Sequence, residues 1–294
     1  MSSLSFFPSQ SPGADLSGHT LIVPAVSIGN VPQLTVDLLI HHVPLGLRYL
    51  GAFDSTEWCL PYACPQDHVS SAGKSNGADT SMLGLPLQLY SNSSLRLTVL
   101  QQRSPILKVA KRDFALALLN WAKSAGIAQI LVLSSLDAGL RVDAEMHIPL
   151  VHLLASPASR SSSSVLKTLA QSFPAFQPQA THEDDLPPRP KASPSSGLPF
   201  LPGAGLTRLL LQAAAEDSLP VGALLMFAGE GDNRGDAHAM ATFLLDILKR
   251  ASESEQDAAS APSASAPFER DGAFKEPRSW LTVFGQRMDQ AIYG

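Results

Sequence analysis

The stretch from His19 to Ile40, HTLIVPAVSIGNVPQLTVDLLI, constrains the fold more than any other part of the chain. It opens with strand-forming residues at 21–23 and passes through a Gly29–Asn30 turn. It then continues with apolar residues at a spacing that fits a well-buried helix better than an exposed one. Asn30 is predicted to be the N-cap of this helix, and Pro32 suits its first turn. A buried strand, a glycine turn and a helix form the opening unit of an α/β domain.

The rest of the chain repeats this alternation. The segment 106–126 has helical periodicity and ends at a glycine, and the apolar run 130–133 follows at once as a buried strand, which is the order that a parallel sheet requires. Other segments with strand character are 46–51, 147–154, 221–227 and a hairpin of 85–90 with 95–100, and the other predicted helices are 206–215 and 235–250. We therefore predict an α/β fold with a mostly parallel central sheet and flanking helices.

Low-complexity segments divide the chain into one domain with insertions. The α/β domain is predicted at 18–250, after a disordered tail at 1–17. Segments rich in Ser, Pro and charge cannot bury enough apolar surface to offset the entropy lost on ordering. We expect disordered insertions near 65–82, 156–164 and 177–198 and a disordered linker at 251–275. Residues 276–294 return to apolar character and are predicted to form a C-terminal helix and tail of the same domain.

Composition excludes several classes of protein. The net charge is −5 with no long basic run, which argues against nucleic acid as the main partner. No apolar run reaches the ~18 residues of a membrane span, and the N-terminus lacks the pattern of a signal peptide. Cys59 and Cys64 are therefore expected to be reduced, in the cytosol or nucleus. With His68 they would supply only three ligands, so we expect neither a metal site nor a cofactor.

Three glycine-bearing turns are the strongest candidates for a ligand site. Gly29–Asn30 and the segment 201–206 precede helices, whose N-termini attract phosphate, but both lack the glycine fingerprints of nucleotide sites. The turn 229–236, GEGDNRGD, carries carboxylates that suit a divalent ion, although Glu230 and Asp236 could instead neutralise Arg234 or cap the next helix. Plain turns and caps are the preferred interpretation.

No catalytic constellation is visible in the sequence. His41 and His42 end a predicted helix, where positive charge is favourable, and His238 lies inside another helix. None is near a serine or cysteine nucleophile motif, and G-x-S-x-G is absent. We predict that the protein is not an enzyme. The alternative kept open is a nucleoside- or phosphate-handling α/β enzyme, which folds of this kind can host.

Several motifs resemble the proteasome assembly chaperone 2 family. They are LIVPAVSIGNVPQLTVDLLI, the segment Gln101–Ser104, LLNWAKSAG at 118–126 with the following strand and Ser134–Ser135, LPGAGL at 201–206, GEGDN at 229–233 with Asp236–Ala237, and Ser279–Trp280 with Phe284–Gly285. They occur in the family's order and cover most of the predicted ordered chain. The low-complexity insertions are longer than expected for the family.

This resemblance implies a function and partners. It implies a heterodimer with proteasome assembly chaperone 1 that promotes formation of the α-ring of the 20S proteasome from α subunits and prevents off-pathway α-ring association. It also implies a location in cytoplasm and nucleus. The last three residues, Ile292, Tyr293 and Gly294, read as the hydrophobic–Tyr–any tail with which proteasome activators and some assembly chaperones enter pockets between α subunits. The alternative is a frayed terminus with a chance tyrosine.

Overall fold

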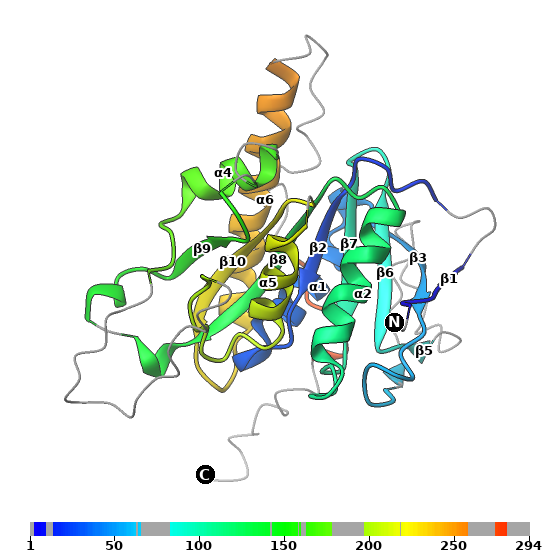
Figure 1. Cartoon of the computed structure of the whole chain (residues 1–294), viewed down its shortest axis with the longest axis horizontal. Helices are drawn as coiled ribbons and strands as arrows, with labels where there is room; N and C mark the ends of the chain where they lie inside the picture. The colour runs from blue at the N-terminus through cyan, green and yellow to red at the C-terminus, as the bar shows by residue number, and fades with distance from the viewer. Residues whose placement is uncertain are drawn as a thin grey trace, which may run out of the picture.

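A computed structural model describes residues 3–9, 14–62, 64–65, 83–141, 143–157, 159, 163–177, 197–217, 219–257 and 274–280. The fold has three layers, with one large sheet between two layers of helices (Figure 1). Helices α2 (Lys111–Ser124) and α5 (Thr207–Ala215) cover one face, and α1 (Val31–His41), α4 (Ser164–Ser172) and α6 (Arg234–Asp257) cover the other. None of the described helices is long and apolar enough to cross a lipid bilayer.

The sheet is mixed, with a parallel centre and antiparallel flanks. Its strand order is β1-β3-β6-β7-β2-β8-β10-β9. The bounds are β1 Phe6–Pro8, β2 Thr20–Pro24, β3 Arg48–Phe53, β6 Leu87–Asn92, β7 Leu97–Gln102, β8 Gln129–Asp137, β9 Leu150–Leu154 and β10 Val221–Ala228, and β4 (Cys64–Pro65) pairs with β5 (Leu83–Gly84) in a separate ribbon. Strands β7, β2, β8 and β10 run parallel. The predicted α/β class, the parallel core and the 85–100 hairpin are confirmed.

The central strands are buried on both faces, which explains their continuous apolar sequences. Leu21 and Val23 of β2 face the α2 and α5 layer, whereas Ile22 between them faces the α1 and α6 layer. Helix α1 is buried along almost its whole length, as its apolar pattern predicted. Asn30 stands at its N-cap position but makes no side-chain capping bond, because it adopts a left-handed conformation with φ 54°.

The predicted disordered tail at 1–17 is wrong for the residues that the structure describes. Strand β1 pairs antiparallel with β3 at the edge of the sheet, and Leu4 and Leu16 are buried. The Phe6 ring lies 5.1 Å from that of Phe53 and 6.1 Å from that of Trp121, between ring centroids. The N-terminal segment is therefore part of the core.

The other boundaries also differ from the sequence-based prediction. Helix α6 continues to Asp257, so the predicted linker begins too early, since Ser and Glu are compatible with a helix that has no Gly or Pro to stop it. Helix α4 was missed, and Ser163, assigned to an insertion, caps it by accepting a hydrogen bond from the Leu166 amide. Leu198 is buried at the end of another predicted insertion. Residues 66–82 and 178–196 lie outside the described residues.

The paired phenylalanines of β1 provide a test of the corrected N-terminus. Phe6→Ala should lower the free energy of unfolding by about 2 kcal/mol, because it removes a ring that packs on two aromatic neighbours. Phe7→Ala is the matched control and should change it by less than about 0.5 kcal/mol, since Phe7 is 61% exposed. Urea unfolding measures both. Equal and small effects would mean that β1 does not pack as described.

Candidate functional site

The three glycine-bearing turns meet at the carboxyl end of the parallel strands, where open α/β sheets usually bind ligands. The amide of Ile28, beside the first turn, donates to Gly203 O of the second at 3.0 Å. A Cβ on Gly205 would lie 2.0 Å from Val26 O. The turns therefore approach one another too closely for any residue with a side chain, and backbone fills the space between them.

The third turn reaches the same place through Asn233. A Cβ on Gly29 would lie 2.6 Å from both Asn233 Nδ2 and Gly229 O. Asn233 is buried, and its Nδ2 donates to Gly229 O at 3.0 Å and Gly231 O at 3.1 Å. The Asn233 amide thus fixes the conformation of the third turn and fills the space beside Gly29. Gly29, Gly203 and Gly205 allow neighbouring segments of the chain to pack closely against one another. These residues therefore do not support a phosphate-binding site.

Hydroxyl groups complete this junction. Ser27 Oγ accepts from the Ser135 amide at 3.0 Å and donates to Ala25 O at 3.1 Å. Ser134 Oγ and Thr207 Oγ1 both donate to Ala204 O, at 3.2 and 2.8 Å. These buried polar atoms are satisfied inside the protein, as buried groups need to be. Ser27 and Ser134 connect neighbouring segments by hydrogen bonds, and this contact geometry gives no support to a role as nucleophiles.

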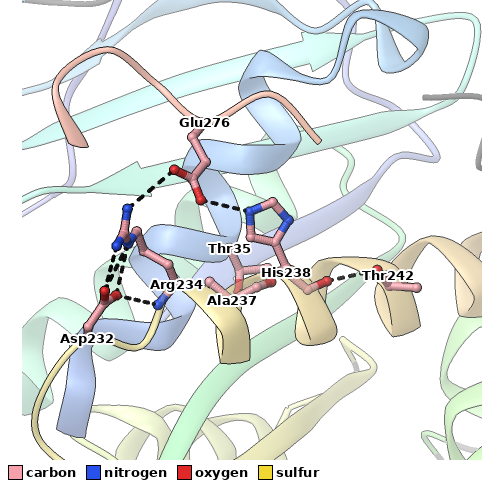
Figure 2. A network of polar contacts seen from close by, with 7 residues as sticks. All are labelled: Thr35, Asp232, Arg234, Ala237, His238, Thr242 and Glu276. Atoms are coloured by element: carbon pink, nitrogen blue, oxygen red, sulfur yellow. Dashed lines mark hydrogen bonds and ion pairs between the residues drawn. The ribbon is translucent and has the colours of Figure 1, made fainter. Parts of the chain in front are cut away.

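One carboxylate of the 229–236 turn, that of Asp232, contacts an arginine. Asp232 forms a two-pronged contact with Arg234, with Arg234 Nε at 2.9 Å from Oδ1 and Nη2 at 2.7 Å from Oδ2 (Figure 2). Asp232 thus neutralises Arg234, together with Glu276 at 3.6 Å. Among the described residues no group of three His, Cys, Asp or Glu side chains could hold a metal ion.

A second polar cluster surrounds Asp37 in the middle of α1. This carboxylate is buried and accepts hydrogen bonds from Gln101 Nε2, from Arg103 Nη1 at 2.7 Å and from Trp280 Nε1 at 3.3 Å. Burial opposes the charged form of Arg103, but the charge and hydrogen bond of Asp37, with smaller contributions from Tyr62 and Tyr90, together outweigh it, so the pKa of this guanidinium is raised. A buried ion pair needs further hydrogen bonds, which Gln101 and Trp280 donate to the Asp37 carboxylate, whereas Arg103 Nε is buried without a hydrogen-bond partner among the described residues. Helix α1, the end of β7 and the C-terminal segment therefore meet at one carboxylate.

The cysteine and histidine candidates have structural surroundings. Cys59 is buried, and burial raises the pKa of its thiol to about 11, which keeps it protonated and unreactive. His42 is buried against the Phe274 ring, and burial lowers its pKa. His41 Nδ1 contacts Asp37 O in its own helix at 2.8 Å. His68 and the side chain of Cys64 lie outside the described residues, as do Ile292, Tyr293 and Gly294.

Two polar features of the structure were not predicted from the sequence. His19 contacts Thr98 Oγ1 at 2.8 Å and Ser91 Oγ at 3.4 Å, but the histidine and the serine are each buried, so a substrate has no access to the pair. The other is the Asp37 cluster. A single acid inside the apolar run LTVDLLI was the available signal, because a buried charge needs partners.

Similar proteins identify the family of this chain. A model of the PAC2 family matches residues 21–255. The chain belongs to the PAC2 family. Relatives named proteasome assembly chaperone 2 from Bos taurus and Homo sapiens are each 31% identical, covering 98% of this chain and 100% of theirs. Among solved structures, Pyrococcus furiosus PbaA, described as an archaeal homolog of proteasome-assembly chaperone, has a TM-score of 0.53 at 11% identity over 91% of this chain and 86% of its own.

These similarities support the fold and the family of the chain. The likeness to PbaA confirms the fold alone, since its identity to this chain is low. The family match spans the described sheet and helices from β2 through almost all of α6. The family resemblance found in the sequence is thereby confirmed. Its motif segments at 21–40, 201–206 and 229–233 form the packed turns, and Asp37, Arg103 and Trp280 of the Asp37 cluster also belong to motif segments.

The packed turns provide a second test. Gly205→Ala should lower the free energy of unfolding by about 2 kcal/mol more than Gly18→Ala, because its Cβ would overlap Val26 O. Gly18 is the matched control: it also has positive φ, +77° against +59°, but open space around it. Chemical denaturation compares the two variants. Equal losses would show that the turns are loose enough to admit a side chain.

Proposed function

We propose that this PAC2-family chain is a proteasome assembly chaperone. It acts as a heterodimer with proteasome assembly chaperone 1, promotes formation of the 20S α-ring from α subunits, and prevents off-pathway α-ring association in cytoplasm and nucleus. The observation that carries this proposal is the match along nearly the whole chain to relatives named proteasome assembly chaperone 2. The packing at the sheet edge supports it, because Asn233 and backbone atoms lie where a side chain at position 29 or 205 would be.

The proposed function needs no chemistry at the sheet edge. A chaperone of this kind acts by binding, so rigid loops and exposed contact surfaces matter more than an open cleft. The described surface carries exposed apolar side chains of a kind suited to protein contacts, among them Val43, Leu60 and Val109 at 76%, 59% and 90% exposure. The nucleoside- or phosphate-handling alternative has no comparable observation in its favour.

The heterodimer makes a direct prediction about stability. A partner that binds only the folded state stabilises it by mass action. The isolated chain is expected to self-associate, because an interface made for a partner leaves apolar surface exposed. Adding purified proteasome assembly chaperone 1 should raise the melting temperature of this chain and convert the self-associated protein into a defined one-to-one complex. Differential scanning fluorimetry and light scattering measure this, with an unrelated protein at equal concentration as control. The heterodimer would be contradicted if the chain alone is monodisperse and its melting temperature does not change when proteasome assembly chaperone 1 is added.

We further propose that Ile292, Tyr293 and Gly294 dock in a pocket between α subunits. Ile292 offers apolar area, Tyr293 adds a large ring with a hydroxyl group, and the terminal carboxylate offers a negative charge for a lysine in the pocket. Gly294 keeps the end of the chain slim. What supports the proposal is the order of these residue types, together with family membership.

The position of the carboxylate gives the tail its sharpest test. Deleting residues 292–294, or adding one glycine after Gly294, should weaken affinity for α-ring intermediates by a similar factor, about 10-fold, because both remove the charge from its partner. The matched control inserts the same glycine after Ala264, which leaves the end of the chain intact and should bind normally. Surface-immobilised α-ring intermediates allow the affinities to be measured. If both tail variants and Tyr293→Ala bind with the same affinity as the wild-type chain, docking of residues 292–294 between α subunits is excluded.

A further inference from the structure

The turn at 107–110 leads from β7 into α2 and carries the most exposed large apolar side chain among the described residues, Val109, which is 90% exposed. The Ala110 amide closes the turn by donating to Leu107 O at 2.9 Å, and the Leu107 amide donates to Trp58 O at 2.8 Å. Trp58 is buried, with its ring 5.7 Å from that of Phe114 between centroids. A firmly attached turn therefore presents Val109 to solvent.

Three cationic side chains lie in and directly after this turn. Lys108 precedes Val109, and Lys111 and Arg112 follow it, against one acid, Asp113. Lys108 and Arg112 are exposed, and Lys111 is partly exposed. Within the part of the chain that the structure describes, none of the three cations forms an ion pair. We call residues 108–112 the basic turn, which combines uncompensated positive charge with an exposed apolar side chain.

These cations do not serve the stability of α2. Lys111 and Arg112 are its first two residues, and Ala110 at the N-cap position makes no side-chain hydrogen bond. The N-terminus of a helix carries partial positive charge, so positive side chains there are unfavourable. A helix optimised for stability alone would begin with a serine or aspartate cap and acidic residues. The composition of the basic turn therefore points to a contact outside the domain.

The chemistry of the basic turn fits an acidic protein surface. Opposite charges steer two proteins together, and an exposed valine adds an apolar contact. Nucleic acid fits less well, because the net charge of the chain is −5 and residues 107–113 include no aromatic side chain on which a base could stack. Long-lived interfaces are more apolar and are depleted in lysine, so the basic turn suits a partner that is bound and released.

We propose that the basic turn docks on an acidic surface of a proteasome α subunit, the partner that an assembly chaperone binds and releases. The inference rests on the proposed function. In this contact Lys108, Lys111 and Arg112 face carboxylates of the α subunit, and Val109 meets an apolar side chain. The carboxylates of the partner also supply the negative charge that the beginning of α2 lacks, so docking offsets the stability that the cations cost the free chain.

Lys111→Glu separates binding from folding, because it should shift the two in opposite directions. A carboxylate at the beginning of a helix is favourable, so the melting temperature should rise by about 2 °C. Since the new side chain faces carboxylates, affinity for α-ring intermediates should fall about 10-fold, and this loss should shrink in ~0.5 M salt, which screens exposed charges. Both measurements use the full chain together with proteasome assembly chaperone 1.

Matched variants separate the basic turn from general surface effects. Lys167→Glu changes the net charge equally at an exposed lysine of α4, on the opposite face of the sheet, and should bind as wild type does. Val109→Ser should weaken binding about 5-fold at low and high salt alike, because it removes an apolar contact. Val43→Ser, at a residue that is 76% exposed beyond the end of α1, should leave the affinity unchanged.

The outcomes distinguish this inference from the proposed function. Wild-type affinity in both Lys111→Glu and Val109→Ser, or equal losses in Lys111→Glu and Lys167→Glu, overturns the inference and leaves the proposed function intact. A lower melting temperature of Lys111→Glu also overturns it, since the lysine would then stabilise the domain. So does binding of a single-stranded RNA homopolymer that depends equally on Lys111. If the unaltered chain with its partner does not bind α-ring intermediates, the proposed function fails and the inference fails with it.

Discussion

Placing a carboxylate inside an apolar helix is the constraint on which much of this structure depends. Asp37 lies between Val36 and Leu38, both fully buried, so its charge has left water at a large desolvation penalty. The penalty is tolerable because Arg103 and Gln101 approach from the end of β7. Those two residues reach Asp37 only if α1 packs in one register across the sheet. The buried pair therefore specifies how the opening strand–turn–helix unit fits the neighbouring hairpin.

The carboxyl end of the sheet shows how the same α/β architecture can lose a ligand site. In open α/β sheets, short turns leave a crevice at this edge, and the N-termini of helices point into that crevice. Here the turn after β2, the segment before α5 and the turn before α6 lie so close that Gly29 and Gly205 have no room for a Cβ. Ser27 and Asn233 bond the loops together. Rigid loops at this edge suit a protein that binds other proteins, as proposed.

The elements that the sequence predicts correctly are those in which long-range packing imposes a strong local pattern of apolar residues. Strand β2, helices α1 and α2 and the β6–β7 hairpin have clear periodicity, because each is buried on defined faces. Strand β1 has only three residues, and its order comes from Phe6 meeting Phe53 and Trp121, which no local pattern reveals. Helix α4 was hidden by its serine-rich flank.

The site was predictable only in part for the same reason. The glycine turns were recognised, and turns were preferred over cradles, but their mutual contact joins segments far apart in sequence. The hydrogen bond from Trp280 to Asp37 spans 243 positions along the chain. A lone acid in an apolar helix shows that a partner exists but not which residue it is. The tail at 292–294 lies outside the described residues and stays a prediction.

A three-residue tail raises a general question of affinity. So small a segment buries little surface, and association costs translational and rotational freedom whatever the size of the contact. Such a tail becomes useful when the rest of the molecule is held nearby, because its docking is then intramolecular and depends on the length of the tether. In this chain Phe274, Glu276 and Trp280 attach residues 274–280 to the domain through His42, His238 and Asp37. Closely packed turns at the sheet edge and an attached segment at 274–280 therefore both suit the proposed function, which acts by binding.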